Sequence, residues 1–127
     1  MIKMIQAVLL LGLGLILPFT FAQSSYPNKA IHLIVPFEAG GTSDTTARSM
    51  AIKLEKALNT TIVVENRVGA NGAIGALAVK NASPDGYTLL HTTPAFLINM
   101  VANKNIGYDV FRDFTPITLM GTGTGYV

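Results

Sequence analysis

Apolar residues recur along the chain with two spacings, and these spacings predict short strands that alternate with helices. Runs rich in β-branched and other apolar residues predict strands over 31–35, 61–65 and 87–91. A helix is predicted over 43–58, because its apolar residues lie three or four positions apart and form one stripe that a core can bury. The members of that stripe are Ala47, Met50, Ala51, Leu54 and Leu58.

The same pattern continues more weakly in the second half of the chain. A second helix is predicted over 71–81 and a short third helix over 94–102. Residues 106–113 are expected to form a loop, and residues 115–120 to begin a fourth strand. The packing face of the second helix is predicted to consist of Ile74, Leu77 and Ala78.

Polar residues indicate where the first helix begins and ends. Thr42 or Ser43 is expected to cap its start, and Asn59 is expected to end it. Asp44 lies four residues before Arg48, so the two side chains can pair on the helix surface, and its charge suits the positive end of the helix.

The order strand-helix-strand-helix-strand predicts an α/β fold with a parallel sheet, flanking helices and right-handed crossovers. In open sheets of this kind, ligands bind beyond the carboxyl ends of the strands. The loops that follow the predicted strands are therefore the place to look for a site.

Two of these loops are rich in glycine. Residues 36–44 join the first strand to the first helix, and residues 66–75 follow the second strand. Glycines let a backbone turn sharply and approach a ligand closely, and a helix start adds unpaired N–H donors and a positive dipole end. Two such loops on neighbouring parallel strands would converge on one anionic ligand.

The first 22 residues have the pattern of a secretory signal peptide. Lys3 precedes an apolar run over 7–17, Pro18 breaks that run, and Thr20 and Ala22 place small residues before an expected cleavage after residue 22. The run is shorter than the ~20 residues that a membrane crossing needs. With no cysteine in the chain, a lipoprotein anchor is excluded.

Charge and residue types exclude several classes of partner. The formal net charge is only +2, and the basic residues are scattered rather than clustered, so a nucleic-acid surface is not predicted. The two histidines, His32 and His91, lack metal-ligand spacing, and no cysteine can complete a zinc site. Each histidine is therefore expected to be structural, and no metal or cofactor is expected.

Sequence patterns of enzymes are not matched. Gly69, Gly72 and Gly75 are spaced every three residues, whereas dinucleotide binding needs Gly-x-Gly-x-x-Gly. The nucleophile elbow Gly-x-Ser-x-Gly does not occur either. The expectation is a chain that is not an enzyme, with a secreted α/β enzyme acting on small carboxylates as the less favoured alternative.

An ordered set of motifs spans nearly all of the chain after the leader and resembles one family. The motifs are Tyr26-Pro27-x-Lys29-x-Ile31, Val35-Pro36-Phe37-x-x-Gly40-Gly41-x-x-Asp44, Val64-Glu65-Asn66-Arg67-x-Gly69-Ala70-x-Gly72-x-Ile74-Gly75, Pro84-Asp85-Gly86-Tyr87-Thr88-Leu89-Leu90, Tyr108-Asp109 and Arg112-Asp113-Phe114-Thr115-Pro116. Together they closely resemble the substrate-binding proteins of tripartite tricarboxylate transporters, the Bug family. Val68, Asn71 and Met100 depart from that family's usual proline, glycine and proline.

The resemblance implies a two-lobed fold like that of periplasmic binding proteins, the Venus flytrap. It further implies a periplasmic monomer that captures a small carboxylate between its lobes for the membrane subunits of a transporter. Members of the family are much longer, so residues 23–127 are expected to form an incomplete N-terminal lobe. A truncated, non-functional fragment is the alternative.

The resemblance and the loop chemistry together select the candidate ligand-binding residues. They are Phe37, Gly40, Gly41, Thr42, Asp44, Gly69, Ala70, Asn71, Gly72, Thr92 and Thr93. Asp44 either contacts the ligand or acts only as a helix-end charge. Thr92 and Thr93 either offer hydroxyls or simply start a helix. Arg67 suits carboxylates chemically, but is expected to be a structural partner of Glu65 instead.

Overall fold

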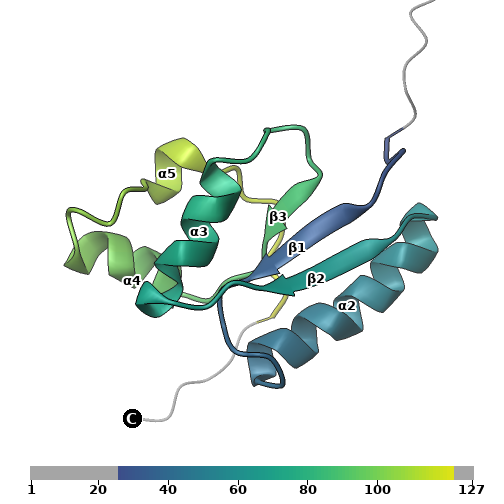
Figure 1. The fold of residues 1–127 in the computed structure, drawn as a ribbon, viewed down its shortest axis with the longest axis horizontal. Coiled ribbons are helices and arrows are strands. Elements are labelled where there is room, and N and C mark those ends of the chain that lie inside the picture. The colour runs from purple at the N-terminus through teal and green to yellow at the C-terminus, as the bar shows by residue number, and fades with distance from the viewer. Residues whose placement is uncertain (1–25, 122–127) are drawn as a thin grey trace, which may run out of the picture.

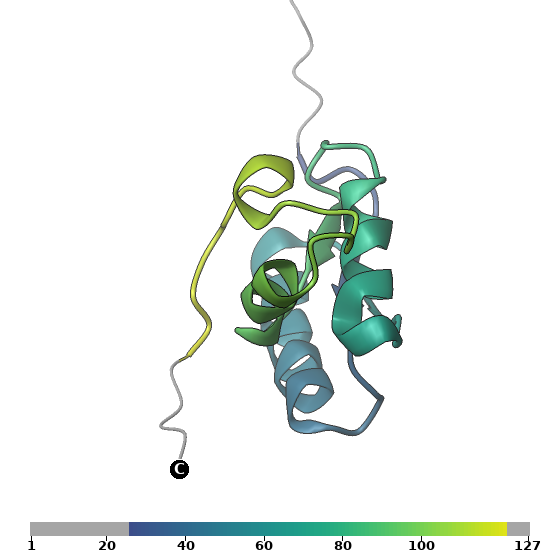
Figure 2. The same ribbon diagram turned by 90° about the vertical axis from the view of Figure 1, so that its left-hand side faces the viewer.

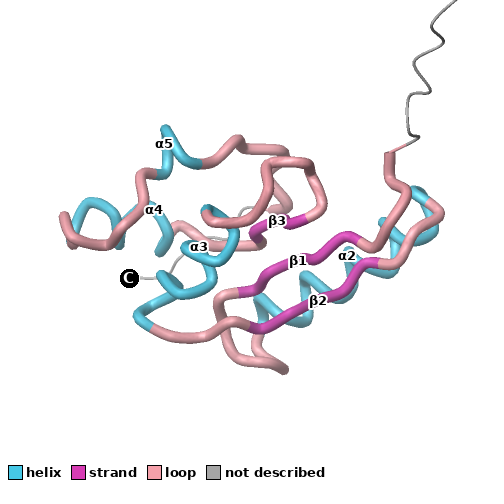
Figure 3. The backbone as a smooth tube through the Cα atoms, turned by 45° about the horizontal axis from the view of Figure 1, so that its top comes forward, coloured by secondary structure: helices cyan, strands magenta, loops and turns pink. Residues whose placement is uncertain are grey.

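The structure is a computed structural model that describes residues 26–121. Its centre is a parallel sheet of three strands, β1 (Ile31–Val35), β2 (Ile62–Asn66) and β3 (Thr88–Leu90), in the order β2-β1-β3 (Figures 1 and 3). In the central strand, Ile31 pairs with Ile62 of β2 and His32 with Thr88 of β3. The predicted parallel sheet is confirmed, with strand ends that shift by one residue in β2 and β3.

Helix α2 (Thr42–Leu58) covers one face of the sheet and encloses the main core (Figure 1). Alternate residues of β1 point to this face and are buried against the predicted stripe of α2. The prediction is wrong for Leu58, which is 38% exposed, because it lies at the end of the helix. The buried members of this core are Ile31, Leu33, Val35, Ala47, Ala51 and Ile62. Asn59 ends the helix in the left-handed conformation, at φ 50°, as predicted.

The predicted caps at the start of α2 are wrong. Gly41 is the N-cap residue, Thr42 is already helical, and no side chain accepts a hydrogen bond from the first turn. The glycine turn brings the backbone into the helix one residue earlier than the polar pattern suggested. The first turn of α2 therefore keeps its N–H donors.

The opposite face is covered by helix α3 (Ala73–Lys80), which follows a 3₁₀ turn, η1 (Ala70–Gly72) (Figures 1 and 2). The predicted packing face is wrong in part, because Ile74 is 51% exposed while Ala73 and Ala76 are buried. Gly75 explains why α3 is turned with Ile74 outward and its alanines toward the sheet. A Cβ atom at this position would lie 2.8 Å from the Cβ of Pro36, so only the small side of the helix fits against the end of β1.

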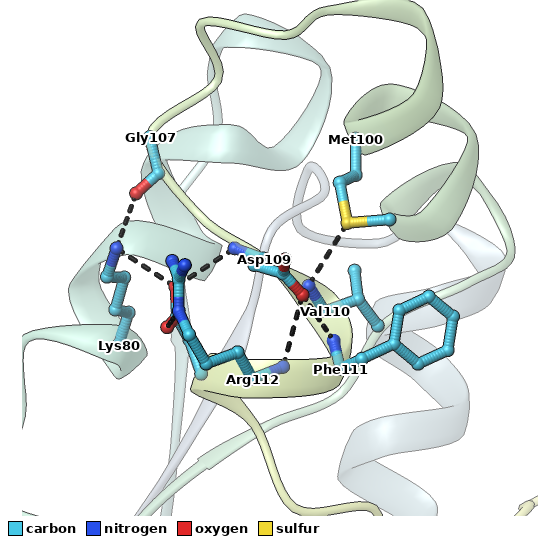
Figure 4. Close-up of polar contacts among 8 residues, drawn as sticks. Lys80, Met100, Gly107, Asp109, Val110, Phe111 and Arg112 are labelled. Carbon is cyan, nitrogen blue, oxygen red and sulfur yellow. Dashed lines mark hydrogen bonds and ion pairs between the residues drawn. The ribbon is translucent and has the colours of Figure 1, made fainter.

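The chain then forms helix α4 (Ala95–Ala102) and a short helix, α5 (Val110–Asp113), beside α3. Three aromatic rings pack between them with centroids 4.9–6.0 Å apart: Phe96, Tyr108 and Phe114. The prediction of a loop over 106–113 is therefore wrong for residues 110–113, which form α5. Asp109 caps α5 by accepting from the N–H groups of Phe111 and Arg112 (Figure 4).

A polar network ties α5 to the end of α3. The ammonium of Lys80 lies 3.0 Å from a carboxylate oxygen of Asp113 and donates to the carbonyl of Gly107 (Figure 4). The carboxylate of Asp113 also accepts from Arg112 and from the N–H of Asp109. These donors, Arg112 foremost, hold the pKa of Asp113 well below its ordinary value.

The predicted fourth strand over 115–120 is also wrong. This segment is extended but pairs with no other strand within residues 26–121. The side chains of Ile117 and Leu119 are about three-quarters exposed, at 75% and 77%. An alternating apolar sequence forms a strand only where a neighbouring strand supplies partners for its backbone N–H and C=O groups.

The predicted signal peptide falls outside the described residues. Within residues 26–121, no helix combines the length and apolar character that a membrane crossing requires.

Candidate ligand-binding site

Three loops follow the three strands and meet at one edge of the sheet. We call residues 36–41 the first glycine loop, residues 67–72 the second glycine loop and residues 91–94 the threonine segment. Because the strands are parallel and β1 is central, both glycine loops leave neighbouring strands at their carboxyl ends. The sequence prediction that they lie together is confirmed.

The first glycine loop is held by the carboxylate of Asp44, which is only 3% exposed. One oxygen accepts from the N–H of Gly40 at 2.8 Å and from Nε of Arg48 at 3.0 Å. The other accepts from Nδ2 of Asn66 at 2.9 Å. The hydrogen bond from Arg48, then those from Gly40 and Asn66, keep the pKa of Asp44 far below its ordinary value.

Asn66, at the end of β2, joins the first loop to the next strand. Its amide nitrogen donates to the carbonyl of Phe37 as well as to Asp44, and its oxygen accepts from Nη2 of Arg48. Sequence reasoning assigned no role to Asn66 or Arg48 here beyond the pairing of Arg48 with Asp44. That four-residue spacing was the only sequence signal for the network.

The start of α2 presents backbone donors to this edge. The N–H groups of Thr42, Ser43 and Asp44 have no acceptor within residues 26–121. The hydroxyl oxygen of Ser43 is buried there and is also without a partner among the described residues. Unpaired donors at a helix N-terminus favour an anion, because the helix dipole is positive at that end.

The second glycine loop turns by successive residues with positive φ. The values are 133° at Gly69, 46° at Ala70, 53° at Asn71 and 92° at Gly72. Gly72 donates to the carbonyl of Gly69 at 2.9 Å, whereas the N–H groups of Ala70 and Asn71 have no acceptor within the described residues. This loop therefore also offers backbone donors.

An open hollow of about 260 Å³ lies between the two glycine loops. Its single charged lining residue is Glu38, so any attraction for an anion must come from N–H groups rather than from a basic side chain. The residues that line it are Pro36, Phe37, Glu38, Val68, Gly69, Asn71 and Gly72.

A second hollow of similar volume lies over the sheet, beside α3. Its polar groups satisfy one another, since Glu65 accepts from Nδ1 of His32 and from the guanidinium of Arg67. These bonds, that of His32 foremost, lower the pKa of Glu65. The predicted pairing of Arg67 with Glu65 is confirmed, and this hollow leaves fewer free groups for a ligand than the first.

The candidate residues are thus distributed over one edge. Four of them line the hollow: Phe37, Gly69, Asn71 and Gly72. Ala70 lies between two of these, and Gly40, Gly41, Thr42 and Asp44 form the first loop and the start of α2.

The threonine segment begins at His91. Burial lowers the pKa of its imidazole, and its Nδ1 atom lies 3.0 Å from the sulfur of Met120. Thr92 is half-buried and Thr93 is exposed, and the carbonyl of Thr93 accepts from Phe96 at the start of α4. Within the described residues, histidine and acidic side chains do not gather in a group that would hold a metal ion.

Comparison with known proteins gives consistent matches. The family model described as tripartite tricarboxylate transporter family receptor matches residues 46–126. BugT of Bordetella pertussis is 37% identical over 99 residues, which are 76% of this chain and 30% of BugT. A UPF0065 protein of Agrobacterium vitis is 40% identical over 99 residues, 78% of this chain and 29% of that protein. The chain therefore spans just under a third of the length of these relatives.

Solved structures agree with the sequence relatives. The periplasmic binding protein BugD has a TM-score of 0.50 at 48% identity, over 51% of this chain and 22% of BugD. A Rhodopseudomonas palustris protein solved with adipate has a TM-score of 0.53 at 39% identity, over 54% and 23% of the two chains. MatC of the same organism, solved with malate, has a TM-score of 0.50 at 40% identity, over 51% and 22%. The chain belongs to the family of tripartite tricarboxylate transporter receptors.

Proposed function

We propose that this chain supplies one side of the binding site of a periplasmic receptor, which captures a small carboxylate for the membrane subunits of a tripartite transporter. The family assignment supports a receptor role, and two structural neighbours were solved with the dicarboxylates adipate and malate. Capture requires no catalytic step, and the matched proteins are receptors and binding proteins rather than enzymes.

The free backbone donors at the edge of the sheet carry the proposal. Thr42, Ser43 and Asp44 present N–H groups at the start of α2, and Ala70 and Asn71 present them from the second glycine loop. A carboxylate has two oxygens that accept several hydrogen bonds, and bonds to a charged acceptor each contribute ~1.5–3 kcal/mol. Donors that point at an anion from two loops also fix its orientation.

Residues 23–127 alone are expected to bind weakly, because a two-lobed site gains affinity by enclosing its ligand. A dissociation constant of about 1 mM corresponds to a binding free energy of only ~4 kcal/mol. Titration must therefore be followed by a method that detects weak binding, such as the backbone amide signals of the ¹⁵N-labelled protein in nuclear magnetic resonance.

The test is a titration of residues 23–127 with adipate, malate and the neutral diamide of adipate. We expect the diacids to shift the amide signals of residues 42–44 and 70–72, and the diamide to leave them in place. Equal shifts with the diamide, or diacid shifts that fall elsewhere, would reject the anion site. Recovery of the diacid unchanged after prolonged incubation would separate capture from turnover.

The leader belongs to the same proposal. Export through a signal peptide cleaved after Ala22 would give a periplasmic chain that begins at Gln23. N-terminal sequencing of periplasmic material checks the site, and a membrane-bound product that retains residues 1–22 would contradict it.

A further inference from the structure

The second glycine loop is held in its unusual conformation by a residue outside it. Ala70 and Asn71 both adopt positive φ although neither is glycine. For residues with a side chain this region is energetically unfavourable, and asparagine tolerates it better than alanine. Two such residues in a row need support from the surrounding structure.

Asn99, on helix α4, provides two bonds to a single residue of the loop. The side-chain nitrogen of Asn71 donates to the side-chain oxygen of Asn99 at 2.6 Å. The side-chain nitrogen of Asn99 donates in return to the backbone carbonyl of Asn71. Asn99 therefore fixes both the side chain and the peptide plane of Asn71.

Fixing that peptide plane also restrains the two N–H donors that precede it in the loop. The carbonyl of Asn71 is occupied by Asn99, while the N–H groups of Ala70 and Asn71 remain without an acceptor in residues 26–121. Asn71 lines the hollow between the glycine loops. The orientation of these free donors is thus coupled to the position of α4.

Helix α4 is itself anchored next to Asn99. The sulfur of Met100 accepts from the N–H of Val110 at 3.2 Å, which joins α4 to α5 (Figure 4). The ring of Phe96, at the other end of the same helix, stacks on Tyr108. The support of the second loop therefore extends through two helices that do not touch the hollow themselves.

We propose that Asn99 is a positioning residue of the carboxylate site, which holds the second glycine loop in the conformation that binds. This inference rests on the proposed function of the loop. It predicts that ligand affinity depends on a residue that does not contact the ligand. It also predicts that glycine at residue 71, which takes positive φ freely, restores part of the ligand affinity that is lost without Asn99.

The test compares four forms of residues 23–127: the wild type, Asn99→Ala, Asn71→Gly with Asn99→Ala, and Asn103→Ala. Asn103 is the matched control, because it follows the same helix and, among the described residues, its side chain accepts only from its neighbour Asn105. Adipate affinity is measured from amide shifts, and amide hydrogen exchange is measured at Gly72, whose N–H is bonded to the carbonyl of Gly69. Thermal unfolding is recorded for every variant.

Loss of both bonds in Asn99→Ala is expected to weaken adipate binding about tenfold and to speed exchange at Gly72. Asn103→Ala is expected to match the wild type. Glycine takes positive φ without cost, so Asn71→Gly is expected to recover about threefold of the affinity that Asn99→Ala loses. A merely structural Asn99 would lower the unfolding temperature and leave the affinity of the folded protein unchanged.

Failure of the inference and failure of the proposed function give different results. If the wild type binds adipate and Asn99→Ala binds equally well, or if glycine at residue 71 recovers nothing, the positioning role is rejected and the receptor role stands. If the wild type binds no diacid, the receptor site is rejected. In that case, unchanged exchange at Gly72 in Asn99→Ala rejects the support of the loop as well.

Discussion

The two glycine loops lie side by side on neighbouring strands, yet they are stabilised by different means. The first loop is held by the buried carboxylate of Asp44, which accepts hydrogen bonds from three donors. In the second loop, no charged side chain of the described residues holds residues 69–72; their strained backbone is held by the two hydrogen bonds between Asn71 and Asn99. One loop depends on electrostatics and burial, and the other on backbone conformation and a clamp from α4.

This difference has a consequence for how each loop responds to change. A buried carboxylate with several donors resists distortion, but it fails abruptly when it loses its charge. A loop held by neutral, exposed hydrogen bonds loses only ~0.5–1.5 kcal/mol for each bond. We therefore expect the first loop to be rigid and sensitive to acid, and the second to be adjustable and insensitive to pH.

The largest effect is expected for Asp44→Asn. The amide cannot accept from Gly40 and Arg48 as a carboxylate does, so the first loop and the start of α2 should loosen. Because the pKa of Asp44 is lowered in the folded state, its contribution to stability is fully present above the ordinary value of 3.8 and is lost as the pH falls below it. Urea unfolding from pH 7 to pH 2 should show a flatter pH profile for the variant. Parallel profiles would show that this carboxylate does not support the fold.

Gly75→Ala should give the next largest loss. The new Cβ would lie 2.8 Å from the side chain of Pro36 and 3.0 Å from the carbonyl of Arg67, so α3 must move away from both loops. Overpacking of this kind costs 1–3 kcal/mol, of which alanine's better helix propensity returns about 1. We expect a net loss of up to about 2 kcal/mol in urea unfolding. A gain in stability would show that α3 moves freely, and that the two loops are not coupled through it.

A pair of opposite substitutions compares the two backbones directly. Gly40 has φ 82° with open space around it, so Gly40→Ala should cost about 1 kcal/mol from conformation alone. Ala70 has φ 46°, so Ala70→Gly should relieve strain and stabilise the protein by about 0.5 kcal/mol, after glycine's extra freedom in the unfolded chain is counted. We expect the two substitutions to change the unfolding free energy in opposite directions. Changes of the same sign would show that the second loop is not strained at Ala70.

The smallest effect concerns ligand affinity rather than stability. Glu38 is the one charged residue that lines the hollow between the loops. Its removal in Glu38→Gln should strengthen binding of a dianionic ligand about twofold at low ionic strength, and less at high salt. Asp85→Asn is the control, because it removes a charge of the same sign from the exposed pair of Asp85 and Lys29, and Asp85 does not line this hollow. A weaker affinity for Glu38→Gln would mean that Glu38 binds the ligand rather than repels it.

Local pattern was sufficient for the strands and for α2, because alternate residues of β1 and residues three or four apart in α2 face one core. It failed where a distant contact decides the outcome. Residues 115–120 alternate like a strand but lack a partner within the described residues. Ile74 was expected in the core, yet the contact of Gly75 with Pro36 turns the smaller residues of α3 inward.

The candidate site shows the same division. The glycine loops were predictable, since turns of this kind need glycine in the sequence itself. Their supports were not, because Asn66 reaches Asp44 and Asn99 reaches Asn71 only after the sheet and α4 have formed. Asparagine occurs at many turns and helix ends, so its residue type alone does not reveal which backbone it will hold.

The central strand β1 is also the first strand to be synthesised. Its partners, β2 and β3, lie about 30 and 55 residues further along the chain. A chain that emerges from a ribosome or a membrane channel with its N-terminus first must keep this apolar strand unpaired until both partners have followed. Parallel pairing of distant segments is slow to form. For the export proposed above, this delay is useful, because a chain that has not yet closed its sheet remains fit to pass through a translocation channel.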